Sequence, residues 1–183
     1  YYKVALSYKI SLGELADIIN GFKQSRETRF VANMSDDLVK KLYSTYLNFL
    51  PIDEFSYPLV THEDERGSFT EFVKSNAAGQ VSINISKPGI AKGNHWHHTK
   101  NEKFLVVKGE GVIQFRDIFS EEVIEYYVSD KELEVVDIPT GYTHNIINHG
   151  DEDMITIMWV NEPFDPDTPD TYFKEVKIWE NLK

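Results

Sequence analysis

The sequence GNHWHHTKNEKF, residues 93–104, holds three of the six histidines in the chain. His95 and His97 are two residues apart, so on a strand their side chains point to the same face. Glu102 follows shortly afterwards, and His144 comes later, just after a Pro-Thr-Gly turn. Three imidazoles and one carboxylate are ligands that suit Zn, Fe, Mn, Ni and Cu. These four residues therefore predict a divalent-metal site.

The spacing around these ligands extends into a longer pattern. It reads G-x5-H-x-H-x4-E-x6-G from Gly89 to Gly109, and P-x-G-x2-H-x3-N from Pro139 to Asn148. So many specified positions do not coincide by chance, because each residue type is used at a few per cent in ordinary proteins. The pattern resembles both motifs of the cupin superfamily, with Leu133 standing where the second motif has a glycine. That resemblance implies a double-stranded β-helix, the cupin form of the jelly-roll barrel.

The segments on both sides of the histidines read as short strands. In QVSINIS, residues 80–86, apolar Val81, Ile83 and Ile85 alternate with polar residues. Several short runs of this kind, separated by Gly and Pro, predict an all-β barrel. The tail at 164–179 is rich in Pro and Asp and then amphipathic, which predicts a loop and a final packed segment. The other strand-like runs are 104–107, 111–115, 123–128, 133–138 and 154–160.

The first fifty residues differ from the rest, because they read as two helices. Ser11 and Glu14 form an S-x-x-E capping box, and a second helix over 35–51 is capped by Ser35 or Asp36. Both helices carry an apolar stripe at helical spacing, which predicts that they pack into a core. Two helices are too little for an independent domain, so they must pack on something else. The stripes are Leu12, Leu15, Ile18, Ile19 and Phe22, then Val39, Leu42, Tyr43, Tyr46 and Leu50.

The composition excludes several classes of function. A net charge of -11 opposes nonspecific binding to nucleic acids or anionic membranes, which need a basic surface. The chain has no cysteine, so it has neither a disulfide nor a thiolate metal site, and we expect a cytoplasmic protein. No run approaches the ~20 apolar residues of a membrane-spanning helix. Because the sequence starts with Tyr1-Tyr2 rather than Met, we expect it to be part of a longer protein.

A second motif lies before the histidines. The segment DERGSFTE, residues 64–71, resembles the D-x-R-G-x-F-x-E segment of dTDP-4-dehydrorhamnose 3,5-epimerases, which are also cupins. The resemblance implies that Arg66, Phe69 and Glu71 bind a nucleotide-sugar. Arg66 would grip the pyrophosphate through paired hydrogen bonds, and Phe69 would stack or wall the site.

The same epimerases have an R-G-x-H segment whose histidine is the catalytic base. Lys92 and His95 occupy the matching positions here, so the phosphate contact would be made by a point charge. The resemblance thus names His95 as a base, whereas the cupin motif names it as a metal ligand. We expect Zn held by His97, Glu102 and His144, with His95 either completing the shell or acting beside it. In the epimerases, a tyrosine on a later strand is the acid that returns the proton to the opposite face of the sugar. The corresponding strand of this sequence has no tyrosine, so Tyr142 or Tyr127 is the predicted substitute.

The full set of motifs resembles the bifunctional CapF-type enzymes of bacterial capsular polysaccharide synthesis. These join a short-chain dehydrogenase/reductase domain to a C-terminal cupin, which implies reductase helices at residues 1–52 and a cupin at 53–183. The glycine-rich NADPH loop and the Tyr-x-x-x-Lys pair are not in this sequence, where Tyr43 is followed four positions later by Leu47. NADPH would therefore belong only to the missing reductase domain.

What the resemblance implies is a reaction on a UDP-linked 4-keto-6-deoxy-N-acetylhexosamine. The cupin would invert C3 and the reductase would then reduce C4, in the UDP-N-acetyl-L-fucosamine pathway. Three alternatives stay open: a nucleotide-sugar 3,4-ketoisomerase, an Fe-dependent dioxygenase, and a sugar-binding cupin whose metal only stabilises the barrel. We also expect a homodimer that pairs through exchanged edge strands.

Overall fold

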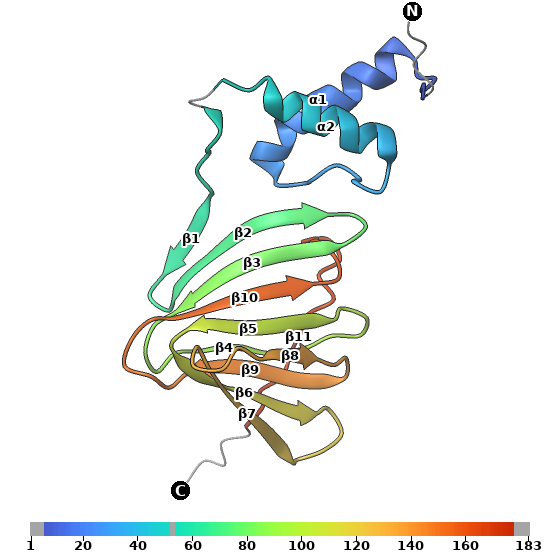
Figure 1. The fold of residues 1–183 in the computed structure, drawn as a ribbon. Helices are drawn as coiled ribbons and strands as arrows, with labels where there is room; N and C mark the ends of the chain where they lie inside the picture. Colours follow the sequence, from blue (N-terminus) through green and yellow to red (C-terminus); the bar gives the residue numbers. More distant parts are fainter. Residues whose placement is uncertain (1–5, 52–53, 178–183) are drawn as a thin grey trace, which may run out of the picture.

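The computed structural model describes residues 6–51 and 54–177, which form a pair of helices and a β domain of two sheets (Figure 1). The predicted domain boundary, between residues 52 and 53, lies outside the described residues. So do the two N-terminal tyrosines and residues 178–179 at the end of the predicted packed segment. Within the described ranges, neither helix is long and apolar enough to cross a membrane.

The two helices begin as the sequence predicts. Helix α1 runs over Leu12–Thr28, and the capping box is present: the Ser11 side chain accepts the Glu14 N–H, and the Glu14 carboxylate accepts the Ser11 N–H at 2.9 Å. Helix α2 runs over Asp37–Asn48, and its cap is Asp36 rather than Ser35, with Asp36 accepting the Val39 N–H at 3.0 Å. These side chains satisfy backbone donors that the first turn of a helix leaves free.

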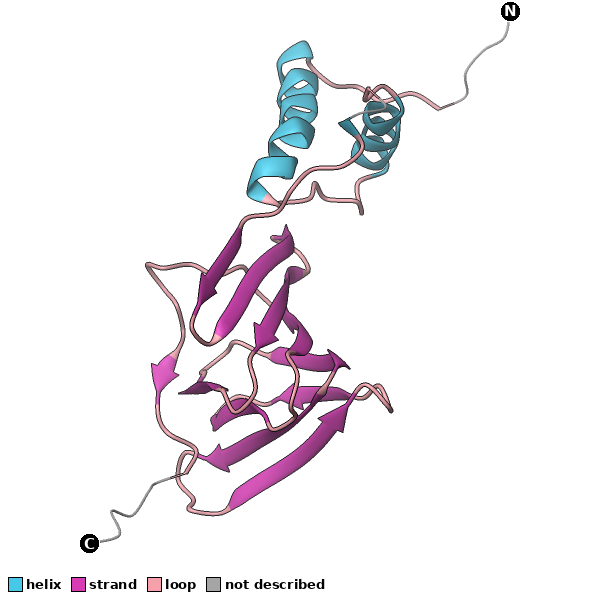
Figure 2. Cartoon of the chain, turned by 90° about the vertical axis from the view of Figure 1, so that its left-hand side faces the viewer, coloured by secondary structure: helices cyan, strands magenta, loops and turns pink. Residues whose placement is uncertain are grey.

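The prediction that both apolar stripes pack into a core holds only in part, because one of the ten residues is buried, seven are half-buried and two are exposed. Phe22 is buried against Tyr43 and Tyr46, with ring centroids 5.1 and 5.7 Å away, but Leu12 is 87% exposed and Ile19 is 41% exposed. In the part of the chain that the structure describes, the helices pack on each other at one end of the β domain (Figure 2), and no sheet covers their stripes. A helical period alone does not say what lies opposite the apolar face.

The β domain consists of two sheets whose strands all pair antiparallel. One sheet has the order β1-β2-β3-β10-β5-β8 and the other β11-β4-β9-β6-β7. This arrangement confirms the predicted all-β jelly-roll architecture. The strands are β1 Thr61–Asp64, β2 Gly67–Ser75, β3 Gly79–Ser86, β4 Ala91–Trp96, β5 Glu102–Lys108, β6 Glu110–Asp117, β7 Val123–Ser129, β8 Val135–Ile138, β9 Tyr142–Asn148, β10 Met154–Val160 and β11 Tyr172–Phe173.

The hydrophobic core lies between the two sheets and is drawn from both. Each buried aliphatic or aromatic side chain of this kind stabilises the fold by about 1.5–3 kcal/mol relative to leaving it in water. The core therefore holds the two sheets face to face and supports the strand ends that carry the histidines. Its members are Phe104, Val106, Val136, Ile138 and Met154 from one sheet, and Ile113, Phe115, Val128 and Ile146 from the other.

Strand β3 alternates as the sequence predicts, but its apolar side chains do not face the interior. Val81, Ile83 and Ile85 are only half-buried, whereas the polar residues between them are buried. The interior at this end of the barrel is therefore polar, as a ligand site requires and a hydrophobic core does not. The buried polar residues of this strand are Gln80, Ser82, Asn84 and Ser86.

The segment after α1 is attached directly to the β domain. Phe30 forms an isolated parallel bridge with Lys74 at the end of β2, and the backbone of Arg29 and Val31 bonds that of Lys74 at 2.8 Å. Arg29 also pairs with Glu71 at 3.4 Å. The helical pair is thus tied to the same strand that carries part of the predicted sugar site.

Candidate metal centre

The four predicted metal ligands converge on one point. His95 lies near the end of β4, His97 follows that strand, Glu102 begins β5, and His144 lies on β9. The pairing of β4 with β9 sets His95 directly opposite His144. One ligand atom from each of the four residues lies within 4.8 Å of the others. The structure therefore brings together residues that are distant in sequence.

The donor atoms at this point suit a metal ion. Nε2 of His97 and Nε2 of His144 lie 3.3 and 3.1 Å from Oε2 of Glu102. All three atoms are buried, and none has a hydrogen-bond partner among the described residues. Ligand atoms bound to one zinc ion at about 2.1 Å lie about 3 to 4 Å apart, so this spacing fits a shared cation. Buried polar atoms without partners are costly, and a cation would satisfy them together.

Backbone carbonyls orient two of the imidazole rings. Nδ1 of His97 lies 2.6 Å from the carbonyl oxygen of Asp170, and Nδ1 of His144 lies 3.4 Å from that of Tyr142. A ring that donates its Nδ1–H to a carbonyl leaves the lone pair on Nε2, the nitrogen that faces Glu102. This arrangement is the one that metal-binding histidines adopt.

The electrostatics of the cluster favour a cation. Burial by itself raises the pKa of Glu102, but the adjacent His144 and His97 outweigh it and hold that pKa well below its usual value. Burial lowers the pKa of His97, but the Glu102 carboxylate and the Asp170 carbonyl outweigh it and raise that pKa. A buried carboxylate thus stays ionised beside histidines, which is the charge distribution that a divalent metal would neutralise.

His95 is a predicted ligand whose ring has a lowered pKa. Burial lowers the pKa of His95 to about 4, and the neighbouring His144 adds to the shift. The ring is therefore neutral near pH 7. A neutral imidazole has a free lone pair, so His95 fits both of its predicted roles, as a metal ligand and as a base.

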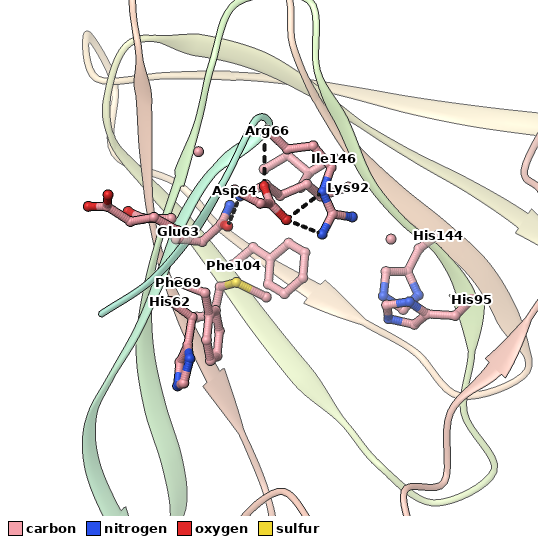
Figure 3. Close-up of a pocket in the computed structure, with 15 residues that line it drawn as sticks. His62, Glu63, Asp64, Arg66, Phe69, Lys92, His95, Phe104, His144 and Ile146 are labelled. Carbon is pink, nitrogen blue, oxygen red and sulfur yellow. Dashed lines mark hydrogen bonds and ion pairs between the residues drawn. The ribbon is translucent and has the colours of Figure 1, made fainter. Parts of the chain in front are cut away.

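A first cavity of about 320 Å³ opens beside this cluster (Figure 3). His95 and His144 lie on one side of it, and Arg66 and Lys92 lie with Asp64 on the other. Three of the predicted substrate-binding residues, Arg66, Phe69 and Lys92, therefore line one cavity with two of the predicted metal ligands. Its remaining walls include His62, Glu63, Ser68, Asn84, Phe104, Ile146 and Met158.

Both cations of this cavity are held in place by neighbours. The Arg66 guanidinium bonds the Asp64 carboxylate through Nε at 3.0 Å and through a second nitrogen at 2.5 Å, in the turn between β1 and β2. Lys92 Nζ donates to Asn84 Oδ1 and to the Ile85 carbonyl, both at 2.8 Å. Burial lowers the pKa of Lys92, so its charge is poorly solvated and would gain from an anion.

A second cavity of about 310 Å³ is lined by other residues of the same predicted metal cluster. His97 and Glu102 line it together with Glu71, while Phe69 and His95 line both cavities. Glu71 is thus separated from Arg66 and Lys92, the residues with which it was grouped in sequence. It is held by Lys74 at 2.7 Å as well as by Arg29. The second cavity also contains Gln80, Ser82, Lys100, Glu162 and Phe164.

The structure does not bring the predicted tyrosines to these cavities. The side chain of Tyr142 packs against the core and lines a third cavity of about 500 Å³, together with Phe115 and Tyr126. Tyr127 is 68% exposed on β7, and its hydroxyl donates to Glu125. Neither tyrosine lines the two cavities beside the predicted metal ligands, so the structure gives no support to either hydroxyl as the opposite-face acid.

Three further residues of the site were not singled out from the sequence, and two of them carry no sequence signal of their own. Asp64 belongs to the D-x-R-G motif, so its contact with Arg66 could have been anticipated. Lys100 is buried in the wall of the second cavity although its sequence context is polar. Asp170 lies in the Pro- and Asp-rich tail, far from His97 in sequence, and only the folded chain brings its carbonyl to that ring.

Comparison with known proteins gives a consistent result. Residues 62–172 match the family model described as polysaccharide biosynthesis C-terminal domain. A UDP-2-acetamido-2,6-beta-L-arabino-hexul-4-ose reductase from Pseudomonas aeruginosa is 43% identical over 93% of this chain and 46% of its own length. The spore coat polysaccharide biosynthesis protein SpsL of Bacillus subtilis is 26% identical over 61% of this chain and 81% of its own length.

A solved structure is similar to nearly the whole chain. The capsular polysaccharide assembling protein CapF from Staphylococcus aureus is 63% identical, with a TM-score of 0.90, over 94% of this chain and 50% of that chain. The chain therefore spans about half the length of the CapF and reductase relatives. These similarities confirm the predicted resemblance to CapF-type enzymes, and the cupin fold with it.

Proposed function

Because the chain belongs to the polysaccharide biosynthesis C-terminal domain family, we propose that it is a nucleotide-sugar 3-epimerase of capsular polysaccharide synthesis. The proposed substrate is a UDP-4-keto-6-deoxy-N-acetylhexosamine of the UDP-N-acetyl-L-fucosamine pathway. The Pseudomonas relative is named as a reductase of a UDP-linked 4-ulose, and this name supports a 4-keto sugar nucleotide as the substrate. The observation that carries the proposal is His95, a neutral imidazole set between candidate metal ligands and a cavity with two cations.

The first cavity would bind the diphosphate of the substrate. Arg66 offers a guanidinium, which grips phosphate oxygens through paired hydrogen bonds, and Lys92 offers a compact positive charge. Phe69 lines both cavities, so it would wall the passage between the diphosphate and the sugar. Glu71, in the second cavity, would accept hydrogen bonds from sugar hydroxyls.

Epimerisation at C3 needs a base beside an activated C–H bond. The C3 proton adjoins the C4 ketone, and it becomes removable when the charge that develops on the ketone oxygen is stabilised. His95 would take this proton from one face of the sugar, and a second group would return a proton to the other face. A zinc ion held by His97, Glu102 and His144 would supply Lewis acidity. His95 would act as the base only while its own nitrogen is not bound to the metal, and as a fourth ligand it could not take the proton. Because Tyr142 lines another cavity, a group other than Tyr142 would return the proton.

The remaining parts of the proposal concern a longer protein. We propose that residues 1–52 end a reductase domain that would reduce C4 with NADPH, and that residues 53–183 form the cupin. We propose a cytoplasmic homodimer that pairs through the cupin strands. The edge strands β1, β8, β7 and β11 support such pairing, because each has one side without a neighbouring strand among the described residues.

The test of this function follows the C3 proton. In deuterated water, the zinc-loaded chain with the UDP-4-keto sugar and no NADPH should replace that proton by deuterium, as NMR would record. We expect His95→Gln to slow the exchange by about 10²–10⁴-fold, the usual contribution of a general base. The matched control is His98→Gln, because that ring is exposed and packs on Trp96 and Tyr172 instead.

Two of the alternative functions give a different result in this experiment. A 3,4-ketoisomerase would yield a 3-keto product, and a sugar-binding cupin would bind the nucleotide-sugar without exchange. Full zinc occupancy with no exchange in the wild-type chain would refute the epimerase proposal. Equal rates for His95→Gln and wild type would remove His95 from the role of base.

The pH dependence provides an independent check on His95. A base works only when deprotonated, and because the pKa of His95 is lowered to about 4, it stays deprotonated far below the ordinary histidine value. We expect kcat/KM for C3 exchange to remain flat from pH 8 down to about pH 5, and then to fall. Bound zinc should be measured at each pH, and a fall centred near pH 6.5 with zinc still bound would contradict the assignment.

A further inference from the structure

Asp170 holds the turn that follows the ligand strand β4. Its carboxylate accepts the backbone N–H groups of His98 at 3.0 Å, Thr99 at 2.9 Å and Lys100 at 3.0 Å. The Thr99 hydroxyl donates to the same carboxylate at 3.1 Å. Burial by itself raises the pKa of Asp170, but the three backbone donors outweigh it and lower that pKa, so the acceptor is an anion at neutral pH.

The backbone of the same residue reaches a predicted metal ligand. The carbonyl of Asp170 lies 2.6 Å from Nδ1 of His97, and Lys100 Nζ donates to the neighbouring Pro169 carbonyl at 2.5 Å. Asp170 adopts φ 40°, a left-handed conformation that is uncommon for residues other than glycine. This conformation accompanies an arrangement in which the carboxylate contacts residues 98–100 while the carbonyl contacts His97.

The next residues of the tail pair with β4, the strand that carries His95. Strand β11 pairs with β4, so that Phe173 lies opposite His95 and Tyr172 lies opposite Trp96. The tail at 169–173 therefore runs along the segment that carries two predicted ligands. Within the tail at 169–173, Asp170 contacts the ring of the predicted ligand His97 and also the turn that begins at His98.

We propose that Asp170 is a positioning residue of the metal centre, which holds the His97 ring with Nε2 directed at Glu102. This inference rests on the proposed metal site. Carbonyl and carboxylate partners of metal-bound histidines fix the ring orientation and the protonated nitrogen, and their loss lowers metal affinity about 10- to 100-fold. His98 and Thr99 are exposed, so the carboxylate orders a surface turn and contributes little to the hydrophobic core.

Variants of Asp170 separate positioning from general stability. Asp170→Ala removes every carboxylate contact and disfavours the left-handed conformation. Asp170→Asn tolerates that conformation and keeps one oxygen acceptor, so it should restore much of the function. Asp167→Ala is the matched control, because Asp167 is an exposed aspartate of the same tail with no side-chain hydrogen bond among the described residues.

The measurements are zinc affinity, by competition with a chelator, and the visible absorption of the Co²⁺-loaded chain, which reports ligand geometry. Circular dichroism would verify that each variant is folded. Asp170→Ala keeps the carbonyl that contacts His97 but releases the turn that holds it, so we expect zinc affinity to fall by up to about 10- to 100-fold, with an altered Co²⁺ spectrum. Asp170→Asn should lose less, and Asp167→Ala should match the wild type.

The outcomes distinguish this inference from the proposed function. If the wild type binds zinc and Asp170→Ala binds it equally well with an unchanged Co²⁺ spectrum, Asp170 does not position the ligand. A wild-type chain that binds neither metal would overturn both the metal site and the inference. Equal losses in Asp170→Ala and Asp167→Ala would also overturn the inference, because they would indicate a general effect of the tail.

Discussion

Replacing Glu102 by glutamine is expected to release zinc and to abolish C3 exchange. The change keeps the shape of the side chain but removes the negative charge at the point where Nε2 of His97 and of His144 converge. Loss of a group that only hydrogen-bonds a metal ligand costs about 10- to 100-fold in metal affinity. Loss of the only predicted anionic ligand should therefore cost more than about 100-fold. Metal content by elemental analysis and deuterium exchange at C3 would be measured on the same samples.

The control for this change is Glu132→Gln, since Glu132 is exposed and outside both cavities. It should keep full zinc content and full exchange. If Glu102→Gln keeps stoichiometric zinc, the carboxylate is not a ligand and the three histidines hold the metal by themselves. If it loses zinc but still exchanges the C3 proton, the metal is structural and Lewis acidity has no part in the reaction.

Replacing Gly93 by alanine is expected to destabilise the protein severely and to damage the metal site. Gly93 has φ 112°, and a Cβ there would lie 2.8 Å from the His144 carbonyl oxygen and 2.9 Å from the Asn145 Cα. Both atoms belong to the backbone of β9, so relief requires β4 and β9 to separate between His95 and His144. Backbone strain and overpacking each cost about 1–3 kcal/mol, a large part of the about 5–15 kcal/mol that stabilises a typical domain.

Gly89→Ala is the matched control for this prediction. Gly89 has a similar left-handed φ of 75°, but a Cβ there would meet nothing within 4 Å. Gly89→Ala should therefore show the cost of the left-handed backbone conformation without a clash against the β9 backbone. Chemical denaturation and zinc affinity of both variants would be compared. An equal loss of unfolding free energy in the two would mean that strain, and not the contact with β9, accounts for the effect.

The metal ligands could be predicted from sequence because their pattern is local. His95 and His97 lie two residues apart, the spacing from which the sequence predicts a shared strand face, although His97 follows the end of β4. The Gly and Pro residues around them mark the turns of a cupin. His144 was placed by its own motif. The Arg66 and Lys92 positions followed from resemblance, and the structure brings both to the cavity beside His95.

Other features depended on contacts that no local pattern contains. Tyr142 lies two residues before His144, so the strand period places both on one face, yet the Tyr142 side chain lines a different cavity. Glu71 was grouped with Arg66 in one motif, but it lies in the second cavity with Lys74. Asp170 had no signal, because its role depends on a tail that returns to the ligand strand.

The sequence by itself thus determined the two helices, most of the strands with their periods, and the four candidate metal ligands that the structure brings together. The tertiary structure alone decided which face of each element is buried. On β3 the alternation was correct, but the polar face with Ser82 and Asn84 is the interior one. On the helices the spacing was correct, but Leu12 remains exposed. The physical reason is that backbone geometry fixes a period locally, whereas burial depends on the partner that distant parts of the chain bring to each face.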